Sequence, residues 1–173
     1  MGGFKMKQRS KSTFLTLIFL IGLIPAVSFS SSSNEADALK GLESVKAVID
    51  FRTGNAKMAA VLLEEIHKTY KGKEIASVTK DPEFVFVFLG PAVKLISTSR
   101  EGIPAEDHKM LDAIAQRISE MAKDGIEFEI CLFAARMMNV DPATVLTEIK
   151  QVQNGMVSLI AYQAKDYSLM PIY

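Results

Sequence analysis

One side chain in this sequence suits nucleophilic chemistry by both its type and its position. Cys131 is the single cysteine among 173 residues, so it has no partner for a disulfide within the chain. It follows the alternating segment 126–130, which predicts a β-strand, and precedes the apolar segment 132–138, which predicts a helix. A thiol at such a junction faces free backbone N–H groups of the first helical turn, and these favour the thiolate. The position predicts a nucleophile that needs no histidine base.

Two turns after other predicted strands are expected beside this thiol. The apolar segments 45–51 and 84–89 predict strands covered on both faces, and each ends in a glycine-containing turn. Ligands of open α/β sheets bind at the carboxyl ends of the strands, which is where these turns fall. The predicted pocket consists of Arg52, Thr53, Gly54, Asn55, Gly90 and Pro91. Within it, Arg52 is either an anion-holding group or an ordinary surface arginine.

The remaining polar candidates indicate no second site. His67 and His108 are expected to be solvated, with His67 opposite the apolar stripe of its helix. Glu127 and Glu129 are expected on a wetted strand face. The methionines fall at core spacings, and the sequence contains neither a phosphate-binding glycine motif nor a metal-ligand spacing. We therefore expect no cofactor and no metal.

The elements that position these residues alternate between strands and helices. The helix after Asn55 carries a single buried stripe, in which Met58, Leu62, Ile66 and Tyr70 recur every four residues with Ala59 and Leu63 alongside. A second helix starts near Asp107 and ends at Gly125. Further along the chain, a short helix is expected over 141–149, a last helix over 156–165 and a last strand over 168–172. Strands joined by helical crossovers predict a three-layer, doubly wound α/β domain, with a mostly parallel sheet and helices on both faces.

The N-terminus predicts export. Four basic residues (Lys5, Lys7, Arg9 and Lys11) precede a weakly polar to apolar run over 14–27. This arrangement is typical of a signal peptide, and the run is shorter than the roughly 20 residues that span a bilayer. Cleavage is expected after Ser28 or Ser30. An uncleaved membrane anchor is the alternative.

This reading divides the chain into a signal peptide over 1–30, a disordered leader over 31–43 and one α/β domain over 44–173. Removing the signal leaves 16 basic against 20 acidic residues, a net charge of about −4. A mildly acidic domain is not expected to bind nucleic acid or, after cleavage, a membrane. The expected location is the periplasm or the exterior.

Cys131 also has a plainer interpretation. A lone cysteine in an apolar stretch commonly serves as a small buried hydrophobic residue. In an exported protein, however, an unpaired thiol is open to oxidation and wrong pairing, which favours a functional reason for keeping it. Both interpretations stay open at this point.

Three segments resemble the DsrE/DsrF-like family of sulfur-relay proteins. They are 48–55, 86–95, and 125–131 with 140–142, and the resemblance covers roughly 44–173. The Gly-Pro-Ala-Val segment and the strand-end cysteine are its specific parts. The resemblance implies a three-layer α/β fold, homo-oligomers that are often trimers or hexamers, and a cysteine that carries sulfur as a persulfide, here Cys131. Relatives often have a histidine before the Gly-Pro pair, where this chain has Leu89.

Together these features predict a periplasmic sulfur carrier or persulfide-handling protein rather than a classical enzyme. Its partner would be a periplasmic sulfur donor or acceptor protein. The main alternative is a non-catalytic oligomeric binding or assembly module in which Cys131 is buried and structural. A peroxide-sensing or disulfide-exchanging thiol is a third possibility, and it would need a cysteine from another chain.

Overall fold

The computed structural model describes residues 1–3 and 37–173, so nearly all of the predicted signal peptide and half of the leader lie outside the described residues. Beyond residue 37 the chain forms strands joined by helices and 3₁₀ segments. In chain order they are β1 (Lys46–Phe51), α2 (Ala56–Tyr70), α3 (Lys73–Val78), β2 (Glu83–Phe88), η1 (Gly90–Ile96), η2 (Ala105–Asp107), α4 (His108–Lys123), β3 (Glu127–Cys131), α5 (Leu132–Met137), η3 (Pro142–Thr144), β4 (Lys150–Val152), α6 (Gly155–Gln163) and β5 (Ser168–Ile172). Among the described residues, no helix is long and apolar enough to span a membrane.

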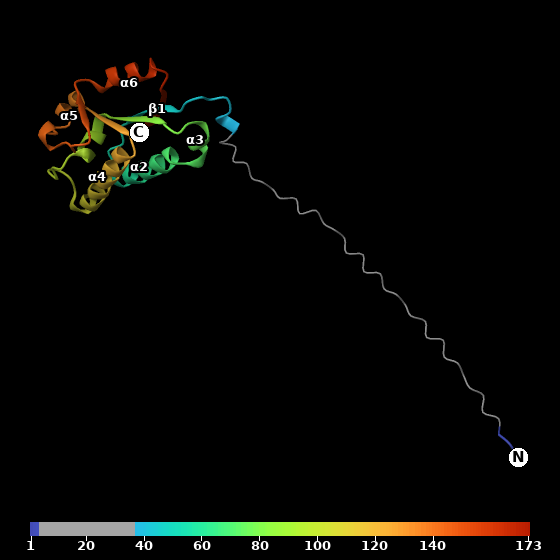
Figure 1. Cartoon of the computed structure of the whole chain (residues 1–173). Coiled ribbons are helices and arrows are strands. Elements are labelled where there is room, and N and C mark those ends of the chain that lie inside the picture. The colour runs from blue at the N-terminus through green and yellow to red at the C-terminus, as the bar shows by residue number, and fades with distance from the viewer. Residues whose placement is uncertain (4–36) are drawn as a thin grey trace. The chain divides into compact units, whose positions relative to one another are not determined.

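The five strands form one parallel sheet in the order β4-β3-β2-β1-β5. The chain steps from β1 to β2, β3 and β4 in one direction, and right-handed crossovers place α2 and α4 on the same face. The connection to β5 runs back across the sheet, and its helix α6 covers the opposite face (Figure 1). The predicted doubly wound α/β fold with helices on both faces is confirmed.

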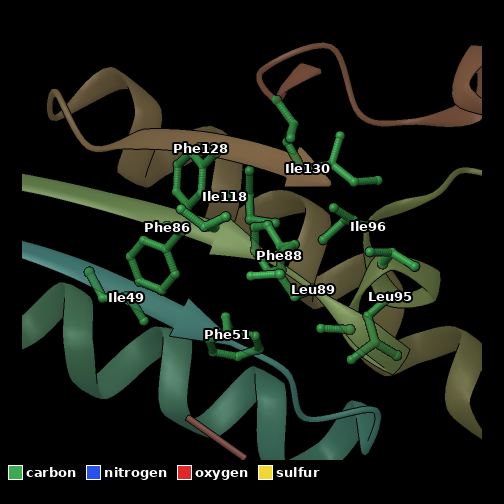
Figure 2. Packing of buried hydrophobic residues seen from close by; sticks show 14 of the residues in the cluster. Ile49, Phe51, Phe86, Phe88, Leu89, Leu95, Ile96, Ile118, Phe128 and Ile130 are labelled. Carbon is green, nitrogen blue, oxygen red and sulfur yellow. The ribbon is translucent and has the colours of Figure 1, made fainter. Parts of the chain in front are cut away.

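Phenylalanines fill the space between the sheet and helices α2 and α4. Phe51, Phe86, Phe88 and Phe128 come from β1, β2 and β3, and their ring centroids lie 5.2 to 6.3 Å apart. Figure 2 shows these rings on one face of the three strands, with Ile118 of α4 beside them. All four side chains are at most 2% exposed, so this layer is the apolar core of the domain.

Helix α2 buries its predicted apolar stripe except at Met58. Met58, expected in the buried stripe, is 51% exposed, whereas Ala59, Leu63 and Ile66 are buried. The small side chain of Ala59 lets the helix backbone approach the sheet closely, which turns the longer Met58 outward. The predicted stripe is therefore wrong at Met58 and confirmed at Ala59, Leu63 and Ile66.

His67 was also predicted wrongly, because it is 6% exposed rather than solvated. Its Nε2 lies 2.6 Å from the Asp124 carboxylate, and Arg117 Nη1 donates to its Nδ1 over 3.3 Å. Arginine has no acceptor, so this geometry makes Nδ1 the acceptor and Nε2–H the donor to Asp124. The histidine thereby ties the end of α2 to α4. His108, by contrast, is half-buried near the start of α4.

The helix expected over 141–149 is wrong as well. Only a 3₁₀ turn forms at Pro142–Thr144, followed by a loop and the short strand β4. Thr144 O accepts from Thr98 N at 2.7 Å, and Leu146 N donates to Ile96 O at 3.1 Å. These tertiary bonds use the backbone groups that a helix would have paired internally.

Candidate functional site

Cys131 is the last residue of β3 and the N-cap of α5, so its predicted strand-to-helix position is confirmed. Its Sγ accepts a hydrogen bond from Ala134 N at 3.5 Å, within the sulfur range. The residue is 1% exposed. The thiol thus has the expected backbone donor but no open path to solvent in this conformation.

Helix α6 covers the thiol at its first residue, Gly155. A Cβ atom on Gly155 would lie 3.0 Å from Cys131 Cβ and 2.9 Å from Val87 Cγ1. Real Cβ atoms rarely approach neighbours so closely, so any larger residue would push α6 away from the sheet. Asn154 caps this helix by accepting from Met156 N at 3.0 Å. The last helix, expected to begin at residue 156, therefore begins at Gly155, and its first turn lies against Cys131.

The sheet face under α6 carries buried charged residues. Strand register places Asp50, Val87 and Glu129 side by side on this face, and Lys150 is next to Glu129 on the edge strand. Asp50 is 4% exposed and Glu129 is 3% exposed. On β3, Glu129 lies two residues before Cys131 and on the same face of the sheet.

Arg52 of the predicted pocket pairs with one of these acids. Its Nε lies 2.8 Å and 3.0 Å from the two carboxylate oxygens of Asp50. The hydrogen bond that Arg52 donates to the Asp50 carboxylate is the main cause that raises the pKa of Arg52. Burial opposes it, and the charges of Asp50, Tyr173 and Cys131 raise the pKa further. Arg52 is therefore within electrostatic range of the thiol while its charge is largely compensated by Asp50.

Glu129 is buried with incomplete hydrogen bonding. Tyr162 of α6 donates to its Oε1 at 3.1 Å, and Lys150 Nζ lies 3.7 Å from the same oxygen. Oε2 is buried and has no hydrogen-bond partner in the described part of the chain. The prediction of a wetted strand face was wrong for Glu129, because α6 covers it, whereas Glu127 is exposed. Burial and then the charge of Glu129 raise the pKa of Tyr162.

Two of the predicted pocket residues hold the turn after β1. Asn55 caps α2 by accepting from Met58 N at 2.9 Å, and Thr53 Oγ1 accepts from Asn55 N at 3.4 Å. Thr53 is buried and Asn55 exposed. Their hydrogen bonds serve the start of the helix.

The two glycine turns of the predicted pocket lie against each other. A Cβ on Gly54 would stand 2.6 Å from Pro91 Cβ, and Gly90 has a φ of +54° where the chain enters η1. Since β1, β2 and β3 are adjacent and parallel, these turns lie at the carboxyl ends of the strands, as Cys131 does. The structure thus brings the predicted segments to one edge, with Gly54 and Pro91 packed together.

Sequence reasoning missed three residues of this region, Gly155, Tyr162 and Asp50. It also missed a cavity of about 540 Å³ beyond the far end of α5. The polar residues that line the cavity are Lys94, Ser97, Ser99, Glu101, Asn139, Asp141 and Thr144. Ser97 and Thr144 hydrogen-bond to each other there, at 2.7 Å between their hydroxyl oxygens. No cluster of potential metal ligands occurs within residues 37–173.

The fold and the site define a small doubly wound α/β domain with one buried thiol at the carboxyl edge of its sheet. The chain belongs to the DsrE/DsrF-like family, whose model matches residues 46–172. At the family level this suggests sulfur relay. A search of curated proteins finds no match.

Solved structures that are similar to this chain include the following two. One is the protein of unknown function MTH1491 from Methanobacterium thermoautotrophicum, with 12% identity, a TM-score of 0.55, and coverage of 74% of this chain and 99% of that chain. The other is the ychN protein from E. coli, with 10% identity, a TM-score of 0.44 and the same coverage. The first of these supports the fold.

Proposed function

We propose that this protein carries sulfane sulfur on Cys131 as one member of a sulfur relay. The observation that carries the proposal is the placement of the only thiol in the chain as the N-cap of α5, with Ala134 N–H directed at its sulfur. A backbone donor of this kind stabilises a thiolate and, after loading, a persulfide anion. The family match supplies the reason to expect sulfur as the cargo.

The loading step is a thiol exchange. The Cys131 thiol first releases its proton to solvent, and the thiolate attacks the outer sulfur of a donor persulfide. The S–S bond of the donor breaks, a new S–S bond forms on Cys131, and the donor leaves as a thiolate that takes up a proton. No net oxidation occurs, so neither a metal nor a redox cofactor is required. Delivery to an acceptor thiol is the reverse reaction with a different partner.

Arg52 provides positive charge near this exchange. Because Asp50 holds its guanidinium by two short contacts, the charge is fixed in place rather than free to reach an anion elsewhere. Its role in the proposal is to moderate the negative charge at Cys131.

The proposed setting is the periplasm or the exterior, and the proposed partners are an exported sulfur donor or acceptor protein and further copies of this chain. The signal-like N-terminus supports an exported location and therefore an exported partner protein. Assembly with further copies of this chain is supported by exposed apolar side chains on the α6 side: Met156, Val157, Ile160, Leu169 and Tyr173. Contiguous apolar surface on a soluble domain commonly marks an interface.

Mass spectrometry tests the proposal. Incubation of the full chain with polysulfide or a loaded sulfurtransferase is expected to add the mass of one sulfur atom to the peptide that contains Cys131. The adduct should disappear after reduction, and the Cys131→Ser variant should not acquire it. A wild-type chain that gains no sulfur under these conditions refutes the carrier function.

The 1% exposure of Cys131 favours a second candidate, an oligomeric binding module with an inert, packed cysteine. On this reading Cys131→Ala leaves both subunit assembly and partner binding unchanged, and the wild type never gains sulfur. Light scattering on the wild type and this variant, read beside the mass spectra, separates the two functions.

A further inference from the structure

Helix α6 stands between Cys131 and solvent, and it is held less firmly than the helices of the other face. It buries only Gly155 and Leu159, whereas Met156, Val157 and Ile160 are 48%, 60% and 68% exposed. The buried residues of α2 are Ala56, Ala59, Leu63, Ile66 and His67, and those of α4 are Leu111, Ile114, Ile118 and Met121. A helix with few buried apolar contacts opens locally at low free-energy cost.

The contacts beneath α6 act in opposite directions. The hydrogen bond from Tyr162 to Glu129 Oε1 joins α6 to β3 and holds the helix down. Burial of the Glu129 carboxylate with Oε2 unpartnered costs free energy, and this cost disappears when the helix lifts and water reaches the oxygen. Lys150 offsets little of it, since its side chain is 70% exposed and lies 3.7 Å away.

We infer that α6 is a movable cover over Cys131, and that Tyr162 and Glu129 are positioning residues that set how often it opens. Tyr162 favours the closed state and the buried charge of Glu129 favours the open state. This inference deepens the proposed function, on which it rests for the need to expose the thiol: the donor reaches Cys131 by way of the α6 opening. The opening itself is a property of the folded chain and requires no donor.

The rate at which a small maleimide labels Cys131 in the native full-length chain measures this opening. Tyr162→Phe removes the hydrogen bond and is expected to speed labelling about tenfold. Glu129→Gln keeps an acceptor for Tyr162 but removes the buried charge, and it is expected to slow labelling several-fold. Amides of α6 in the wild type should exchange with deuterium faster than those of α2 and α4.

Tyr70→Phe is the matched control. Tyr70 donates to Asp124 O at 2.8 Å on the opposite side of the sheet, so this variant loses the same kind of hydrogen bond away from α6. It is expected to label at the wild-type rate. Urea unfolding of all variants shows whether labelling follows global stability.

Three results would overturn the inference. The first is that Tyr162→Phe and Tyr70→Phe both change the labelling rate only by the amount that their change in global unfolding free energy accounts for. The second is faster labelling in Glu129→Gln, and the third is α6 amides as protected as those of α2. These outcomes are separate from the sulfur-loading test. If labelling behaves as expected but the chain never gains sulfur, the movable cover is supported and the carrier function is refuted. If the chain gains sulfur but Tyr162→Phe labels at the wild-type rate, only the movable cover is refuted.

Discussion

The two faces of the sheet differ in the side chains that their strands bury. Under α2 and α4 the strands present phenylalanine and isoleucine, packed without polar interruption (Figure 2). Under α6 the same strands present Asp50, Glu129 and Cys131, covered by one helix of nine residues. The first face contributes stability through apolar burial, and the second buries polar groups, of which Glu129 keeps one oxygen without a hydrogen-bond partner among the described residues. The contrast places the phenylalanine core on one face and the buried polar groups of the strands on the other.

The largest effect is expected from breaking the apolar face. Phe86→Ala removes a fully buried ring from the centre of the phenylalanine cluster and should lower the free energy of unfolding by about 3–5 kcal/mol. Urea unfolding followed by circular dichroism measures the change. Val157→Ala, on the outer side of α6, is the control and should change it by less than about 0.5 kcal/mol. Equal losses in both variants would mean that the two faces do not differ in this way.

Gly155→Ala should have the next largest effect. The new methyl group meets Val87 and Cys131 within 3.0 Å, so α6 must shift, at a cost of about 1–3 kcal/mol in unfolding free energy. Met156→Ala, one residue along the same helix, is the control and should cost less than half as much. If Gly155→Ala proves as stable as the wild type, α6 does not rest on β2 and β3 as described.

Replacing one buried polar residue on each face should give opposite signs. His67→Met removes a histidine that is hydrogen-bonded through both ring nitrogens, and it should lower the unfolding free energy by about 1–3 kcal/mol. Glu129→Met removes a carboxylate with one unpartnered oxygen, and it should leave the unfolding free energy unchanged or raise it by about 1 kcal/mol. Equilibrium unfolding in urea compares them. A large loss in Glu129→Met would show that its charge stabilises the fold.

The smallest effect is an alkaline loss of stability on the α6 side. Burial and the hydrogen bond with Glu83 raise the pKa of Tyr167 from 10.0 to about 12. The folded state therefore keeps the hydroxyl proton more tightly than the unfolded state, and this contribution is complete below pH 10 and is lost as pH rises toward 12. Unfolding free energies measured across that interval should fall more steeply for the wild type than for Tyr167→Phe. Parallel curves for the two proteins would contradict the assignment.

Local signals in the sequence predicted most of the scaffold. The strand expected over 84–89, the last helix expected over 156–165 and the junction at Cys131 all follow from side-chain periodicity and turn chemistry, which neighbours along the chain determine. Alternation also placed Glu129 on the same face as Cys131. It could not show that α6 covers that face, because the covering residue Tyr162 lies 33 positions away.

The errors have the same origin. His67 is buried because Asp124 and Arg117 of another segment satisfy its ring nitrogens, which nothing in its own helix indicates. The segment 141–149 has a helix-like start, but its backbone bonds to residues 96–98 replace helical ones. Strand β4 is three residues long, too short for periodicity to register. The errors at His67 and over 141–149 arose where a distant contact outweighed local preference.

The parallel sheet also fixes the direction in which the domain presents its thiol. All five strands run in the same direction, so Lys46 lies at the amino end of the sheet and Cys131 lies at its carboxyl end. A strand of this length spans about 20 Å. A surface or fluorophore attached ahead of β1 would thus stand behind the domain and leave the cysteine edge facing outward. Immobilisation through the N-terminal side accordingly leaves the carboxyl end of the sheet, with Cys131 beneath α6, facing solution.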